Sequence, residues 1–368
     1  MCGTSIFKRK CPWLSVELLL SFFMWVFFSL KAIAAPENFD PKLTIPPPEP
    51  PPPKPVESPT PPQQPSQNNK SPLFTLESIT PNFKLDKDNF GQQNLWRETA
   101  TKFKLRNGDL LGLTTGFNSF TQDDIPFTSN IPLYWSWQRN TSDYKLTVNS
   151  GVDVYNRLPV TPYLSTTVEI PVFSSVGKKG LRSLLVFSGT IEHQAYKFNA
   201  KTLDHKINYW RFRPSFYWQI LPNFSLFTLG QLGYFNDGNQ EFQSFSRLEK
   251  KLGDFAIAIN VFTWSFQQDL GTTNGYFAPS NFLVYNGEIS WAKSITSWLR
   301  CRVAGSLGKQ RLGNATDNAY SYQALCSTTI GEAVELDFGY SVSNVRDRNT
   351  DDTSYLNQSF DSQLRLNF

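Results

Sequence analysis

The chain is poor in the residues that most catalytic and metal sites use. Its 368 residues include only two histidines, two methionines and four cysteines. Cys2 and Cys11 stand close to the start of the chain, which leaves Cys301 and Cys326 for the main body. Without a Cys-x-x-Cys pair or a cluster of histidines, the sequence predicts no metal site and no cofactor.

The two histidines also lack the neighbours that catalysis needs. A catalytic Ser–His pair on one strand needs a serine two residues from His193, on the same face. That position holds Ala195. Asp204 and His205 are adjacent, and adjacent residues of a strand point to opposite faces. The sequence therefore predicts no catalytic residues and no enzymatic activity.

A strong charge imbalance and long apolar runs are missing as well. The formal net charge is +4, and the 35 Lys and Arg residues are dispersed rather than clustered, so we predict no nucleic-acid partner. Beyond residue 34, no stretch approaches the ~20 apolar residues of a membrane-spanning helix, which excludes helical spans.

The first 34 residues have the three parts of a secretory signal peptide. A basic segment, Lys8–Lys10, precedes a largely apolar stretch, Leu18–Leu30, and the small-x-small sequence Ala32-Ile-Ala34 follows. The apolar stretch is too short for a spanning helix of ~20 residues. We predict export with cleavage after Ala34; an uncleaved anchor is the alternative.

Residues 35–72 differ in composition from everything that follows. More than half of the 25 prolines lie here, followed by a run rich in Gln and Asn. Such a tract cannot pack a core and favours extended polyproline II, so we predict a disordered periplasmic linker. It could act as a spacer or bind a periplasmic protein or the cell wall; a flexible tail without a partner is the alternative.

From residue 73 to residue 368 the sequence reads as a succession of alternating segments. Leu146, Val148 and Val152 alternate with polar neighbours, and the same period of two recurs over 209–220, 299–307 and 334–342. Segments of this length and pattern suit tilted transmembrane strands. The fold class that we predict is all-β, a transmembrane antiparallel up-and-down β-barrel.

The connections predict the number of strands. Short links alternate with longer or more polar ones, such as 121–130 and 310–317, and fifteen links join sixteen strands. Pro81 interrupts the first alternating segment, so fourteen strands is the alternative. Six tryptophans near segment ends are expected to form aromatic girdles at the membrane interfaces: Trp96, Trp135, Trp210, Trp218, Trp291 and Trp298.

The last nine residues end the chain on an apolar face. Phe360, Leu364, Leu366 and Phe368 share one side of a period-two ribbon, and the final residue is aromatic. This ending resembles the assembly signal of bacterial outer-membrane β-barrels. The resemblance implies an outer-membrane location, contact with outer-membrane lipid and recognition by the barrel assembly machinery.

The polar phases of the strands supply the residues that would line the lumen of a barrel. Two interpretations remain open: they line a water-filled pore, or they neutralise one another inside a closed wall. Cys301 and Cys326 fall on apolar phases and are either bonded to each other or two reduced, lipid-facing residues. The predicted pore-lining residues are Lys102, Lys104, Arg211, Arg213, Glu288, Arg300, Arg302 and Arg365.

One segment carries a second, shorter resemblance. Gly275, Tyr276, Phe277 and Pro279 belong to a Gly-aromatic-aromatic-small-Pro sequence that precedes an alternating strand. This motif is similar to one in the C-terminal barrel of the outer-membrane component of cellulose synthase, the family that exports bacterial cellulose. The resemblance implies export of a polysaccharide. Unlike that family, the chain has a prolyl segment where helical repeats would stand.

These observations predict an outer-membrane channel for the passive passage of hydrophilic solute, with export of a polysaccharide as the more specific expectation. The first alternative is a non-conducting structural or adhesin-like barrel that acts through its loops or its proline-rich arm. The second, an energy-coupling protein resembling the TonB type, would need an uncleaved anchor and a small C-terminal domain. The long array of alternating segments argues against it.

Overall fold

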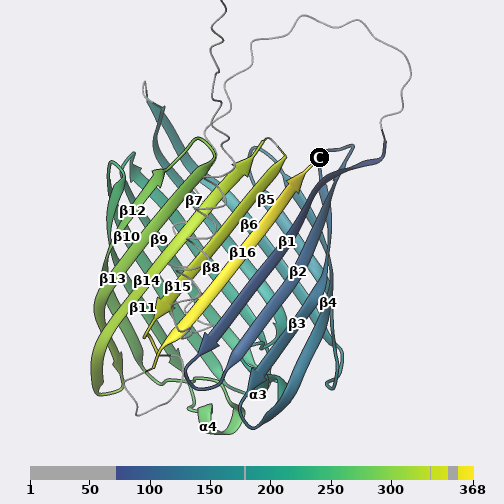
Figure 1. Ribbon diagram of the computed structural model, residues 1–368, viewed down its shortest axis with the longest axis vertical. Coiled ribbons are helices and arrows are strands. Elements are labelled where there is room, and N and C mark those ends of the chain that lie inside the picture. Colours follow the sequence, from purple (N-terminus) through teal and green to yellow (C-terminus); the bar gives the residue numbers. More distant parts are fainter. Residues whose placement is uncertain (1–71, 178–179, 332, 347–354) are drawn as a thin grey trace, which may run out of the picture. The chain divides into compact units, whose positions relative to one another are not determined.

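The structure, a computed structural model, describes residues 72–177, 180–331, 333–346 and 355–368. These residues form sixteen antiparallel strands in one closed barrel (Figure 1). The strands are β1 (Phe74–Asp88), β2 (Gln93–Leu105), β3 (Leu110–Gln122), β4 (Ile125–Asn140), β5 (Lys145–Tyr155), β6 (Thr161–Gly177), β7 (Gly180–Ala195), β8 (Asn208–Leu221), β9 (Phe224–Phe235), β10 (Gln240–Leu252), β11 (Phe255–Phe266), β12 (Phe282–Ser294), β13 (Leu299–Leu312), β14 (Ala315–Ile330), β15 (Val334–Ser343) and β16 (Asn357–Asn367).

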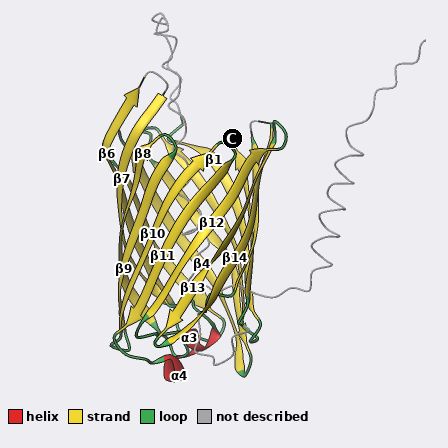
Figure 2. Ribbon diagram, turned by 90° about the vertical axis from the view of Figure 1, so that its left-hand side faces the viewer, coloured by secondary structure: helices red, strands yellow, loops and turns green. Residues whose placement is uncertain are grey.

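Each strand pairs with its neighbours in the sequence, and β1 pairs with β16 to close the cylinder. Because the strands run up and down, β1 begins and β16 ends at the same end, marked by the C-terminus in Figure 2. We call this the turn end and the opposite one the loop end. The only two described helices, α3 (Ala200–Asp204) and α4 (Gly271–Asn274), lie at the loop end.

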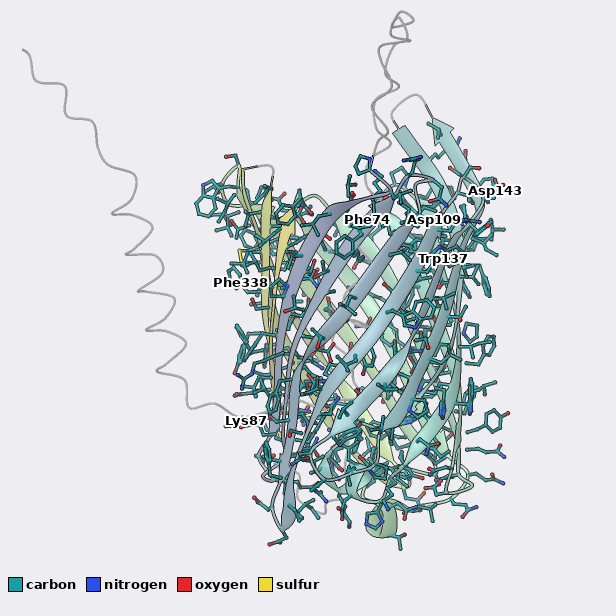
Figure 3. All side chains as sticks on the ribbon, turned by 90° about the vertical axis from the view of Figure 1, so that its right-hand side faces the viewer. Phe74, Lys87, Asp109, Trp137, Asp143 and Phe338 are labelled. Carbon is teal, nitrogen blue, oxygen red and sulfur yellow. A yellow bond between two sulfur atoms is a disulfide. The ribbon has the colours of Figure 1, made fainter. Side chains whose placement is uncertain are left out.

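The period of two in the sequence separates two different faces. On β11, Ala258, Asn260 and Phe262 are buried inside the barrel, while Ile257 and Ile259 are exposed on the outside. Large apolar side chains are exposed on strands all around the cylinder. Figure 3 shows side chains projecting from the outer wall on one side. A soluble protein rarely exposes such a belt, whereas a bilayer requires it.

The strand containing Pro81 is complete, so the sixteen-strand prediction is confirmed and the fourteen-strand alternative is wrong. On its β2 side, Pro81 stands opposite Thr99 in a register that is continuous from Ser78 to Lys87. On its β16 side, the register passes from Ile79–Leu366 to Asn82–Gln363 and leaves out the proline. A proline without an N–H thus weakens the closing ladder locally and still permits the strand.

The predicted contrast between short and long links holds only in part. The links expected over 121–130 and 310–317 shrink to two-residue turns at 123–124 and 313–314, because the strands extend into the polar residues. The length at the loop end is concentrated in the β7–β8 loop (196–207), the β11–β12 loop (267–281) and the β15–β16 loop (344–356), of which 347–354 are not described.

A disulfide joins Cys301 and Cys326, which stand directly opposite each other on β13 and β14. Their neighbours on the same face, Val303 and Tyr322, are exposed on the outside of the barrel. The bonded alternative is therefore the one that the structure contains.

No helix in the described part of the chain is long and apolar enough to cross a membrane. The predicted signal peptide, 1–34, and nearly all of the predicted linker, 35–72, lie outside the described residues.

Candidate functional site

The eight predicted pore-lining residues all lie on the inward face of the barrel. Arg211 and Arg213 point inward from β8, as Glu288, Arg302 and Arg365 do from β12, β13 and β16, through ion pairs with other inward groups. Lys102, Lys104 and Arg300 share the phase of inward neighbours in the register. Their role in solute passage stays a prediction.

Near the loop end, the predicted Arg211 belongs to a buried network. Its guanidinium donates two hydrogen bonds to Glu241, at 2.8 and 3.2 Å. The same carboxylate accepts from the indole of Trp264 at 2.8 Å and from the amide of Gln231 at 3.0 Å. A buried carboxylate that accepts four hydrogen bonds is well compensated, so this network stabilises one arrangement of the wall.

A second network has its centre at Arg247, which is not among the eight predicted residues. Arg247 is 2% exposed at its side chain and donates to Glu249 and to both oxygens of Glu288. Arg302 donates to Glu288 from the other side at 2.7 Å. The alternation over 240–252 could have placed Arg247 inside, but it could not identify a partner 41 residues away.

The turn end of the lumen is more open and its cations are less compensated. Arg365 pairs with Glu335 at 2.6 Å, with both side chains about 40% exposed, 42% and 39%. Among the described residues, Lys102, Lys104 and Arg300 form no ion pair. Both interpretations of the polar phases therefore apply, to different residues: Arg211, Arg302 and Arg365 are paired with carboxylates, whereas the three cations above are not, within the described part of the chain.

The loop end is covered by the β7–β8 loop, which crosses the mouth from β8 towards β2. The backbone carbonyl of Phe198 accepts hydrogen bonds from Gln92 and Asn94, at 3.2 and 2.9 Å. Helix α3 follows and packs against β3 and β4, with Leu203 buried beside Phe120. Asn199 caps this helix by accepting from the backbone N–H of Thr202.

The β11–β12 loop brings the Gly275–Pro279 motif against the β7–β8 loop. Gly275 ends α4 in the left-handed region, with φ of 84°, where a side chain would be strained and would also meet Lys201 at 2.5 Å. Tyr276 donates to Asp237 at 2.7 Å and accepts from Asn239. Burial raises the pKa of Tyr276 well above its ordinary value, so its hydroxyl stays neutral and donates.

Aromatic rings join the two loops to the wall beneath them. Tyr196 and Tyr276 meet edge to face at 5.6 Å, and Phe277 contacts Trp264 of β11 at 5.3 Å. Tyr196, Phe198, Tyr276, Phe277 and Ala278 are at most 4% exposed, and we call these five residues the loop cover. They form one cluster with inward residues of β8 to β12, so the cover extends into the barrel.

A cavity of about 350 Å³ lies beside the loop cover, against the inner wall. Tyr134 lies against the wall opposite Gly151, its ring 4.4 Å from that of Tyr163. We call this cavity the aromatic pocket; it is lined by Lys84, Trp96, Glu98, Tyr134, Tyr163, Gln194, Ala195, Tyr196, Lys197, Phe198, Tyr209 and Arg211.

The prediction that Trp96 belongs to an aromatic girdle at the membrane interface is wrong. The place of Trp96 opposite Asn118 in the β2–β3 register sets it on the inward face, where it packs edge to face on Phe120 at 5.8 Å. Trp135, Trp210 and Trp218 do face outward and are exposed. A tryptophan near a strand end suits either side of a membrane wall, and only the phase of β2, with Asn94 and Glu98, could have indicated the lumen.

The rejected catalytic candidates have other contacts. His193 stacks on Trp210 at 4.7 Å on the outer face, and one of its ring nitrogens lies 2.9 Å from the carbonyl oxygen of Tyr209. Asp204 pairs with Arg157 at 2.5 Å rather than with His205. Within the described ranges, no group of three or more His, Cys, Asp or Glu could hold a metal ion.

No protein-family model matches the sequence, and no curated protein matches it. Among solved structures, the chain is similar to one described as "Bacterial polysaccharide outer membrane secretin", with a TM-score of 0.63 and 9% identity over 80% of this chain and 98% of that one. CdiB from Acinetobacter baumannii gives 0.48 and 12%, covering 80% and 60%. Wzi from Escherichia coli, described as a carbohydrate-binding β-barrel, gives 0.38 and 8%, covering 80% and 84%.

At these identities the likeness shows the fold alone, and of the three structures only the first has a TM-score above 0.5. The chain has the fold of a bacterial outer-membrane β-barrel. Its exposed apolar belt fits that location, because a bilayer is the solvent such a surface requires.

Proposed function

We propose that the protein is an outer-membrane channel for the passive passage of hydrophilic solute, and that the solute is a polysaccharide on its way out of the cell. The observation that carries the channel proposal is the inward face of the closed barrel. It presents charged and polar side chains from β1 to β16, including Lys104 and Arg300, which are exposed at the turn end.

Passage needs no covalent step. A polar lumen replaces part of the water around a solvated solute and so lowers the cost of moving it past hydrocarbon. Lys102, Lys104 and Arg300 at the turn end would meet the solute first on its way out. The loop cover would then be the last barrier, and it would have to move.

The polysaccharide part of the proposal has three supports. The aromatic pocket combines ring faces with hydrogen-bonding groups next to the path of the solute. The Gly275–Pro279 motif, which resembles that of cellulose exporters, supplies two of the aromatic residues in the loop cover. One solved structure that shares the fold is itself described as a polysaccharide secretin.

The loop cover favours a second candidate, the non-conducting barrel. Its five residues are almost fully buried, and the two loops bond to each other and to β2. If this cover never opens, the barrel would anchor whatever its loops or its proline-rich arm bind.

Conductance across a planar bilayer separates the two. We would compare the full chain, a variant in which residues 197–206 are replaced by a short Gly-Ser link, and a variant that lacks residues 36–70. The channel proposal expects rare openings of the full chain and long-lived openings of the loop-shortened variant. Folded, heat-modifiable barrels that stay silent in all three forms would overturn it in favour of the anchor.

A further inference from the structure

We propose that the aromatic pocket is a binding site for a short segment of a neutral pyranose oligosaccharide. This inference rests on the proposed function, because it assigns the class of solute that the channel holds before the loop cover. Its cavity of about 350 Å³ is at the lower end of ligand pockets, about 300–1,000 Å³, so it suits a few sugar rings rather than a long chain.

Aromatic side chains supply the flat surfaces that sugar rings need. Trp96 and Tyr163 reach the pocket from different strands, β2 and β6, and half-buried Tyr134 lies beside them. Tyr196 and Tyr209 also line the pocket but are only 3% exposed each, so the accessible ring surfaces are those of the first three residues. The face of an aromatic ring carries partial negative charge. The C–H groups of a pyranose are polarised by the ring oxygen and hydroxyls, so they carry partial positive charge and stack on such a face.

Polar groups between the rings can serve the hydroxyls, which need partners once they leave water. Gln194 uses its amide N–H on Tyr209 at 2.6 Å, and its amide oxygen remains an acceptor. Glu98 accepts one hydrogen bond, from Asn118 at 2.8 Å, through one of its two carboxylate oxygens. Lys197 lies at the edge, where the β7–β8 loop leaves β7.

The charges favour a neutral ligand over an anion. Each cation of the pocket already has a carboxylate: Lys84 has Asp86 at 2.7 Å, and Lys197 has Asp153 at 2.9 Å. Arg211 is held by the two hydrogen bonds that it donates to Glu241. An anionic sugar would have to displace these partners, whereas hydroxyls can join them.

A cationic sugar could find only one counter-charge. Glu98 is the one carboxylate among the lining residues, and it forms no ion pair with a described residue. The lining also holds three cations, Lys84, Lys197 and Arg211, which would repel a further positive charge, so the pocket favours a neutral ring over an amino sugar.

Isothermal calorimetry on the full chain in detergent tests the proposal without requiring conductance. The probes are cellotetraose and maltotetraose, tetragalacturonate as the anion and the glucosamine tetramer as the cation. We expect at least one neutral tetramer to bind more tightly than both charged ones. Tyr163→Ala and Trp96→Ala should each weaken that binding by about tenfold, the value of one lost ring face.

Tyr163→Phe keeps the ring and should retain binding, which guards against a variant that merely fails to fold. Tyr234→Ala, on the exposed outer face, is the matched control and should change nothing. The proposal is overturned if neither neutral tetramer binds, if both Ala variants bind as the parent does, or if the glucosamine tetramer binds best and Glu98→Gln abolishes it. A barrel that binds a neutral tetramer but never conducts would contradict the channel proposal and still support the binding site.

Discussion

The side-chain amide of Asn199 donates a hydrogen bond of 2.7 Å to the backbone carbonyl of Gly275, 76 residues further along the chain. It is a direct polar bond between the two loops that cover the lumen. The same side chain accepts from the backbone of Thr202 through its oxygen, so one residue caps α3 and fastens the β7–β8 loop to the β11–β12 loop. A change that spares the cap can therefore test the fastening alone.

Asn199→Asp makes that separation. An aspartate keeps the oxygen that caps α3 but places an acceptor against the carbonyl of Gly275, leaving that group without its donor. Loss of such a bond costs about 1–3 kcal/mol. We expect the variant to open more often in a planar bilayer with unchanged strand content by circular dichroism. Asn140→Asp, which adds the same charge at the exposed turn end, should leave the opening frequency unchanged.

The buried arginine in the wall predicts a stability effect. Arg247→Met leaves Glu249 and Glu288 buried without their main cation, a loss that costs about 3–5 kcal/mol in comparable sites. Heat-modifiability on gels should shift to lower temperature. Arg300→Met removes an inward arginine that is exposed and has no ion pair among the described residues, so its midpoint should match the parent. Equal midpoints for both variants would contradict the assignment of Arg247 as the centre of a network.

Much of the fold could be predicted because its signal is local. A strand has a period of two, so the phase of Arg211 and Arg213 on β8 follows from the residues beside them, and the strand count follows from counting such segments. Pro81 gave rise to the fourteen-strand alternative, but the strand pairs with β2 at this residue and only the β16 register omits it. The alternation of the residues along β1 continues past this missing pair.

Residues of the site could be predicted only where the alternation along a strand determines which face they lie on. Alternation places a side chain inside the barrel but does not identify its partner on another strand, as for Arg247 on β10 and Glu288 on β12. The inward course of the loops has no periodic signal, since it depends on tertiary contacts such as Phe277 with Trp264. The motif at Gly275 indicated a resemblance to an export family without indicating that Lys201 packs against this glycine.

The disulfide predicts the state of the exported protein. Because Cys301 and Cys326 are bonded, neither should react with a maleimide until a reductant is added. Closing a loop of this kind stabilises proteins by about 2–4 kcal/mol, so the double variant Cys301→Ala, Cys326→Ala should unfold at lower temperature. A maleimide adduct at either position on the native, unreduced barrel would contradict the bond.

The turn end carries a pH-dependent contact at Asp109, close to Trp137 in Figure 3. Hydrogen bonds from Arg139 above all, and from Trp137 and Asn107, lower the pKa of Asp109 from 3.8 to about 2. A carboxyl whose pKa is depressed in the folded state stabilises the fold above its ordinary pKa and loses that contribution as the pH falls through the folded value. The contact should therefore be complete above about pH 4 and lost near about pH 2.

Thermal unfolding in detergent can detect this loss. The midpoint of the parent should exceed that of Asp109→Asn at neutral pH, and the gap should close as the pH falls from about 4 to about 2. Asp143→Asn removes an exposed aspartate at the same end that pairs with no described cation, and it should produce no such pH-dependent gap. A gap for Asp109→Asn that persists unchanged at about pH 2 would contradict the depressed pKa.

A substitution at Phe368 can test the assembly of the barrel in cells apart from its stability. The side chain of Phe368 is 69% exposed, and its backbone N–H, which any residue would supply, donates to Glu77 at 3.1 Å. Phe368→Ala should therefore refold in detergent as the parent does. If the last strand is the signal for the assembly machinery, the same variant should leave less heat-modifiable barrel in the outer membrane of expressing cells. Phe255→Ala, 54% exposed at the turn end, is the control and should assemble normally; equal assembly of both variants would remove Phe368 from the signal.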